Sequence, residues 1–173
     1  MAVALLLATS LALAGLLFTS VQGFLLASGL AAGASARVLV PGHVGYAIPT
    51  VLLSLFSQSM VIFYFIGTGR LVKDETAGYP EGERRAVARA VADLKRQTSP
   101  AATLALFSAI AVFVLGGAAH TRALPPWTHL AASAAAVALH VWALLAEWRA
   151  FARNTALMND PRAFARRAAA RPG

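Results

Sequence analysis

The charged side chains of this chain are confined to a few short segments, and this constrains the fold more than any other feature. Residues 1–36, 38–69, 97–121 and 123–146 contain no Asp, Glu, Lys or Arg. Each stretch is longer than the roughly 20 residues that an α-helix needs to cross hydrocarbon. Soluble chains carry charges at about a quarter of their positions, against 13% here. A soluble domain is therefore excluded.

The four uncharged stretches predict an all-α, polytopic membrane protein, built as a four-transmembrane-helix antiparallel bundle. We expect a single integral membrane domain that includes all of residues 1–173. The expected spans lie at about residues 3–33, 44–69, 100–120 and 126–149. Residues 70–99 are predicted to form a cytoplasmic loop. This loop should contain an amphipathic surface helix, whose apolar stripe is Val87, Val91 and Leu94.

The basic residues divide unevenly between the connections, which predicts an orientation. Only Arg37 and Arg122 fall on one side, whereas the other 13 of the 15 Lys and Arg residues lie in the 70–99 loop and in the segment from Arg149 through the tail, residues 150–173. The positive-inside rule then places both termini in the cytoplasm, for a chain in a bacterial-type inner membrane. Because topology accounts for the basic excess, the expected partners are the lipid bilayer and other membrane-protein subunits, not nucleic acid.

The tail carries its own signals. Asn159-Asp160-Pro161 indicates a helix stop, followed by an N-cap and a proline at the first position of a new helix. The segment that follows is strongly basic, with Arg162, Arg166, Arg167 and Arg171. Anionic lipid headgroups are the partner that such a segment favours.

The first stretch has two features of note. Ala34-Ser35-Ala36 has the form of a signal-peptide cleavage site, but there is no early basic residue and the apolar run is too long, so we expect no cleavage. Small residues recur every four positions, which creates a face suited to docking of another helix. They are Gly15, Thr19, Gly23 and Ala27.

Polar side chains inside the spans follow helical spacing. His129, His140 and Glu147 fall on one face of the fourth span, and a similar stripe runs along the second. Counting residues inward from the span ends predicts a polar intramembrane layer. Its members are Gln22, Ser54, Ser57, Gln58, Ser108, His140 and Glu147. We interpret Glu147, which adjoins Trp148 and Arg149, as an interfacial group and not as a proton carrier.

The four histidines leave two interpretations open. In the first, they bind a cofactor: haem b, with His43, His129 and His140 as candidate ligands, or a transition metal on His43, His120 and His129. In the second, the outer three are interfacial groups, and His140 is buried with a hydrogen bond to a serine or glutamine. The chain contains no cysteine, so thiolate metal sites and iron–sulfur clusters are excluded.

No hydrolase motif occurs, and no pair of carboxylates lies inside the spans. Whether the chain is an enzyme stays open. If it has an enzymatic role, we expect a subunit of a redox enzyme. The leading hypothesis is a non-catalytic accessory subunit or helper of a membrane complex, which docks through the small-residue face of the first span. The alternative is a b-type haem- or metal-binding electron-transfer protein.

Overall fold

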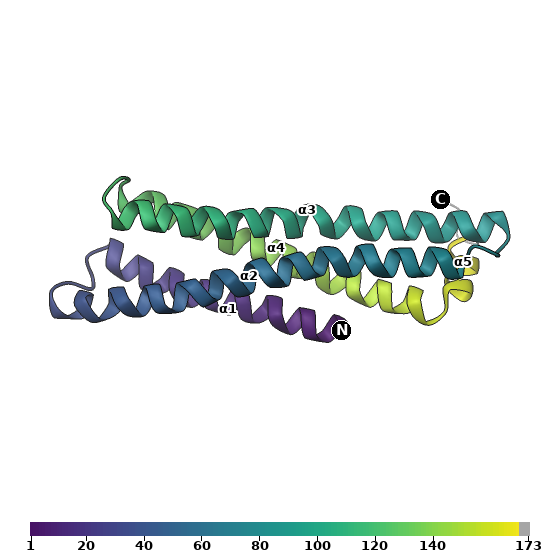
Figure 1. Ribbon diagram of the computed structural model, residues 1–173, viewed down its shortest axis with the longest axis horizontal. Coiled ribbons are helices and arrows are strands. Elements are labelled where there is room, and N and C mark those ends of the chain that lie inside the picture. Colours follow the sequence, from purple (N-terminus) through teal and green to yellow (C-terminus); the bar gives the residue numbers. More distant parts are fainter. Residues whose placement is uncertain (170–173) are drawn as a thin grey trace.

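A computed structural model describes residues 1–169, and every regular element in this range is a helix. The helices are α1 (Ala2–Ala27), α2 (Ala34–Glu75), α3 (Glu81–His120), α4 (Pro126–Asn159) and α5 (Pro161–Ala169). The first four are long and apolar enough to cross a membrane. These helices lie side by side in an elongated bundle (Figure 1). The all-helical fold with four membrane-length helices is thereby confirmed.

The four long helices form a ring in which each packs along two neighbours. The extensive contacts join α1 to α2, α2 to α3, α3 to α4 and α4 to α1, whereas α2 and α4 lie diagonally and meet only narrowly. The connections after α1 and α3 lie at one end, which we call the histidine end (Figure 1). The connection after α2 lies with α5 at the opposite end, which we call the basic end.

The helices extend much further toward the basic end than the expected spans. α2 continues to Glu75 and α3 begins at Glu81, so only residues 76–80 of the expected 70–99 loop lie outside a helix. At 1.5 Å per residue, the 42 residues of α2 measure about 63 Å. This length is about twice the thickness of bilayer hydrocarbon. The helix α2 is therefore longer than one membrane crossing requires.

The predicted surface helix is the first half of α3. Its apolar residues Val87, Val91 and Leu94 are at most 3% exposed and belong to a core that includes Val72 of α2 and Leu157 of α4. The stripe is thus covered by neighbouring helices, which corrects the expectation of a separate surface helix.

Pro100 does not end α3, although we expected a break before it. The proline lacks one backbone donor. Leu94 and Ala102, on either side of it, nevertheless pack into the same core. The Thr98 hydroxyl also donates to the Leu94 carbonyl at 2.8 Å. Burial on both sides of the proline therefore maintains one continuous helix.

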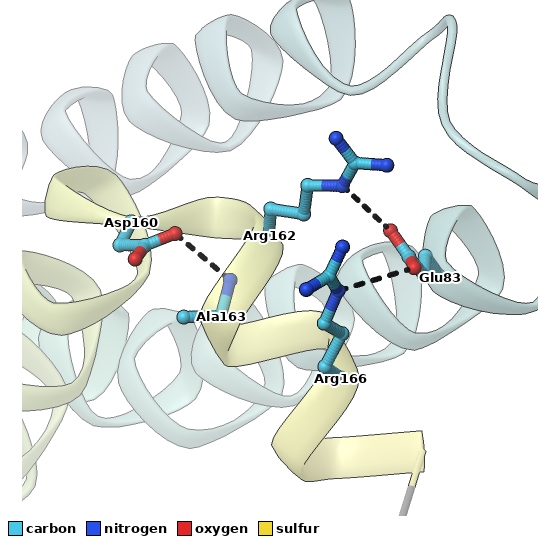
Figure 2. A network of polar contacts seen from close by, with 5 residues as sticks. All are labelled: Glu83, Asp160, Arg162, Ala163 and Arg166. Atoms are coloured by element: carbon cyan, nitrogen blue, oxygen red, sulfur yellow. Dashed lines mark hydrogen bonds and ion pairs between the residues drawn. The ribbon is translucent and has the colours of Figure 1, made fainter.

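The tail folds back on the bundle. Asp160 accepts a hydrogen bond from the Ala163 backbone at 2.8 Å, which confirms the predicted N-cap, and Pro161 begins α5. In Figure 2, Arg162 and Arg166 of α5 reach Glu83 at the start of α3, with nitrogen–oxygen distances of 3.6 and 3.7 Å. Part of the basic charge expected to face lipid therefore has a partner within the chain, while Arg171 lies outside the described residues.

The small-residue face of α1 is used inside the bundle. A Cβ atom at Gly15 would come within 2.5 Å of the Thr50 hydroxyl oxygen, and one at Gly23 would lie 3.6 Å from His43. Both contacts are with α2. The close approach predicted from the small residues thus occurs within this chain, so Gly15 and Gly23 are not free to dock another subunit.

The α2–α3 contact at the basic end is predicted to be sensitive to side-chain volume. A Cβ at Gly69 would lie 2.7 Å from a Val91 methyl, whereas Gly67 has open space around it. Gly69→Leu should therefore destabilise the folded protein by about 1–3 kcal/mol. The measurement is thermal unfolding in detergent, followed by circular dichroism. Gly67→Leu is the matched control, and equal unfolding temperatures for the two variants would contradict this packing.

Candidate functional site

A cavity of about 560 Å³ opens among the four long helices at the histidine end. His43, His120 and His129 all line it. Its volume falls within the roughly 300–1,000 Å³ of typical ligand pockets. The inner part of the wall is mixed, with hydroxyl groups of Thr19, Thr50 and Ser133 among apolar side chains.

His43 and His129 form a close pair across the diagonal of the bundle. Their ring centres are 6.0 Å apart and the ring planes cross at 81°. The Nδ1 atom of each ring is buried and has no hydrogen-bond partner. The two rings thus meet beside the cavity, and each has a buried nitrogen that no hydrogen bond engages.

Each of these rings is positioned by a glycine on the preceding helix. His43 lies against Gly23 of α1, and a Cβ at Gly116 of α3 would lie only 3.0 Å from His129. The backbone carbonyl of the residue four before each glycine, Thr19 or Val112, also lies beside the ring. The α1–α2 and α3–α4 pairs therefore repeat one local design, in which a missing side chain makes room for an imidazole. Gly116 was not among the residues that the sequence analysis singled out.

His120 stands apart from this pair, because it is the last residue of α3 and is exposed. Within residues 1–169 no three His, Cys, Asp or Glu side chains are grouped closely enough to hold a metal ion. The three outer histidines thus share a cavity without forming a common ion site, and the metal set of His43, His120 and His129 stays a prediction.

His140 lies deeper and has partners at both ring nitrogens. Its Nε2 is 2.6 Å from the Ser54 hydroxyl oxygen, and its Nδ1 is 2.8 Å from the Ala136 carbonyl. The predicted hydrogen bond between a buried His140 and a serine is confirmed. Since both nitrogens are engaged, neither is free in this arrangement to ligate a haem iron.

Gln58 and Glu147 lie next in the polar layer, toward the basic end. Glu147 is 0% exposed, and neither of its carboxylate oxygens has a hydrogen-bond partner. Our interpretation of Glu147 as an interfacial group is wrong. Trp148 and Arg149 do face outward, but α4 continues past them to Asn159, and Glu147 occupies the face that points into the bundle.

One member of the predicted layer, Gln22, lies at another level, and two others are hydrogen-bonded within their own helices. Because α1 ends at Ala27, Gln22 is only five residues from its end and lies next to Gly23, at the level of His43. Ser108 is half-buried and donates to the Ala105 carbonyl of its own helix at 2.7 Å. Ser57 is buried as expected, but it too donates within its own helix, to the Ser54 carbonyl at 3.2 Å.

A further buried polar group was missed by the sequence analysis. Asn154 is 1% exposed, and its amide donates to the Tyr64 and Thr68 hydroxyl oxygens at 3.1 and 3.2 Å. We had assigned Asn154 to a tail outside the bundle. A signal was present, since Asn154 follows Glu147 by seven residues, the same interval that separates Glu147 from His140.

We compared the chain with known protein families, curated proteins and solved structures. No family model matches the chain, and neither curated proteins nor solved structures match it. Inference about function therefore rests on the site geometry.

The bond between Ser54 and His140 should stabilise the α2–α4 diagonal. Ser54→Ala is expected to lower the free energy of unfolding in detergent by about 0.5–2 kcal/mol, since interhelical hydrogen bonds contribute about this much. Ser57→Ala, which removes a hydroxyl bonded within its own helix, should cost less. A larger loss in Ser57→Ala than in Ser54→Ala would show that this bond does not link the helices.

Proposed function

We propose that this protein holds a b-type haem between His43 and His129 and takes part in electron transfer. The observation that carries the proposal is the pair itself: two rings from diagonal helices, 6.0 Å apart, each with an unpaired nitrogen. Two imidazoles bound on opposite sides of one metal, with bonds of about 2.0 Å, have ring centres roughly 6.3 Å apart. The observed spacing is close to this requirement.

The surroundings of the pair support the same proposal. The adjoining cavity has the volume of a cofactor pocket, and apolar side chains such as Leu16, Val51 and Val112 contribute to its wall. The carbonyls of Thr19 and Val112 lie beside the rings. Ligating histidines commonly use such carbonyls to fix their orientation. A bound haem would supply one-electron chemistry, while the chain supplies the axial ligands and an apolar pocket.

We further propose that the protein acts as a subunit or helper of a larger membrane complex. The described chain consists of four long helices, short connections and the nine-residue α5, so it has no separate catalytic domain in residues 1–169. A haem held at one end of such a bundle needs a partner that delivers or accepts electrons. A non-catalytic accessory role is the second candidate, favoured by the same small extramembrane mass.

We also propose an orientation of the bundle in the membrane. The bundle would cross an inner membrane in antiparallel fashion, with the basic end and both termini in the cytoplasm, as the distribution of Lys and Arg favours. The haem pair would then lie toward the outer surface. Arg162 and Arg166 are paired with Glu83, so Arg167 is the basic residue of α5 that would face anionic headgroups at the inner surface.

The haem proposal is tested by the absorption spectrum of detergent-purified protein from cells supplied with a haem precursor. We expect a Soret band that shifts on reduction, and its loss or change to a five-coordinate form in His43→Ala and His129→Ala. His120→Ala is the matched control, since it lines the same cavity but lies outside the pair, and it should retain the wild-type spectrum.

Other outcomes separate the alternatives. Protein without a Soret band and without metal by elemental analysis would contradict cofactor binding and favour the accessory role. A bound transition metal that is lost in His120→Ala as well as in the other two variants would favour the three-histidine metal site.

The orientation is tested by cysteine labelling, for which a chain without natural cysteine is a clean background. Thr121 and Gly78 are exposed in the connections at the histidine end and the basic end. In intact spheroplasts, a membrane-impermeant maleimide should modify Thr121→Cys at once and Gly78→Cys only after permeabilisation. The reverse pattern would contradict the proposed orientation.

A further inference from the structure

Glu147 is the most unusual ionisable group in the bundle, and the haem proposal does not use it. It is fully buried, and both carboxylate oxygens lack a hydrogen-bond partner. Among the described residues no Lys, Arg or His forms an ion pair with it, since the five pairs present involve other carboxylates. An isolated carboxylate in such surroundings is strongly disfavoured, so something must compensate its charge.

Neither α1 nor α3 supplies a positive charge that could compensate the Glu147 carboxylate. α1 contains no ionisable side chain, and α3 has none between Arg96 and His120. On the α4 side, Ala143 and Ala146 pack against Ala101 and Ala105 of α3.

The ionisable groups of α2 and α4 near this level are engaged or turned away. In α4, His140 is bound to Ser54 and Ala136, and Arg149 and Arg153 are exposed. In α2, the Tyr64 hydroxyl accepts a bond from Asn154. No counter-charge therefore faces the carboxyl group.

The polar side chains beside the carboxyl group come from two other helices, Thr9 of α1 and Gln58 of α2. The Thr9 hydroxyl already donates to the Leu6 carbonyl at 3.1 Å, so its oxygen offers only lone pairs. Gln58 is 1% exposed and its Oε1 has no partner. The amide NH2 of Gln58 is the donor that the two neighbours still offer, so unpartnered oxygen atoms outnumber donor groups in the cluster.

We propose that Glu147, Gln58 and Thr9 form a proton-binding site in the interior of the bundle. The carboxylate takes up one proton and becomes a neutral carboxylic acid, whose O–H donates to Gln58 Oε1 or to Thr9 Oγ1. Release reverses the step, and no other bond forms or breaks. This inference is independent of the haem proposal, because the site shares no residue with the histidine pair.

A proton fits the cluster better than a metal cation. Hard cations such as Mg²⁺ and Ca²⁺ take about six or more oxygen ligands, whereas these three side chains offer only four oxygen atoms. A proton needs one acceptor on each side, which the carboxylate and Gln58 provide.

Polar groups flank the site along the bundle axis in both directions. His140 with Ser54 lies two turns toward the histidine end, and Asn154 with Tyr64 lies two turns toward the basic end. Seven residues of helix measure about 10 Å, so water would have to bridge each gap for a proton to travel along α4. The site therefore belongs to a column of polar groups inside an otherwise apolar bundle.

The test uses dicyclohexylcarbodiimide, an apolar reagent that modifies protonated carboxyl groups. Full-length protein in detergent or vesicles is treated over a range of pH and mapped by mass spectrometry. We expect an adduct on Glu147 at neutral pH that declines in alkaline solution. The adduct should be lost in Glu147→Gln and retained in Glu83→Gln, the matched control at a carboxylate outside the membrane part.

Infrared spectroscopy gives a second readout that does not depend on access of the reagent. The wild type should show a carboxylic-acid carbonyl band that is absent in Glu147→Gln. Gln58→Leu removes the acceptor and should shift this band upward in frequency. Gln22→Leu, at a buried glutamine near the histidine end, should leave the band in place.

Two results would overturn the proposal. Absence of both the adduct and the acid band at neutral pH would show that Glu147 is ionised. Suppression of the adduct by Na⁺ at constant pH would show that the cluster binds a metal cation and not a proton.

Discussion

The bundle depends on the requirement that polar side chains in hydrocarbon find partners within the protein, because lipid offers none. This requirement turns one face of α2 and one face of α4 toward each other, although the two helices are diagonal in the ring. Ser54 and His140 meet across that diagonal at 2.6 Å, and Asn154 reaches Tyr64 and Thr68 in the same way. Because these polar side chains are gathered in the interior, the outward faces of the helices can be apolar.

Within this frame, the two sites differ in what they lack. At the histidine end, His43 and His129 line a cavity, and each has a buried ring nitrogen without a hydrogen-bond partner. Further toward the basic end, Glu147 and Gln58 bring unpartnered oxygen atoms into a packed interior. The proposed cofactor and the proposed proton would each supply a partner that the surrounding side chains do not.

Residue spacing alone predicted much of this arrangement. The interval of 11 residues in both α2 and α4 placed His43 level with His129 and Ser54 level with His140, and both pairs are in contact. The level assigned to Gln22 was wrong because it depended on where α1 ends.

The sequence by itself determined the number of membrane-length helices and which faces of α2 and α4 are polar, because charge exclusion and helical periodicity are properties of single segments. Only the tertiary structure decided which polar groups find partners. Glu147 adjoins an exposed tryptophan and an exposed arginine in sequence, yet it lies in the interior, since the packing of α1 and α2 on α4 sets the direction it faces. The space for the rings of His43 and His129 likewise comes from Gly23 and Gly116 on neighbouring helices. Such a contact between two helices cannot be read from the sequence of either one.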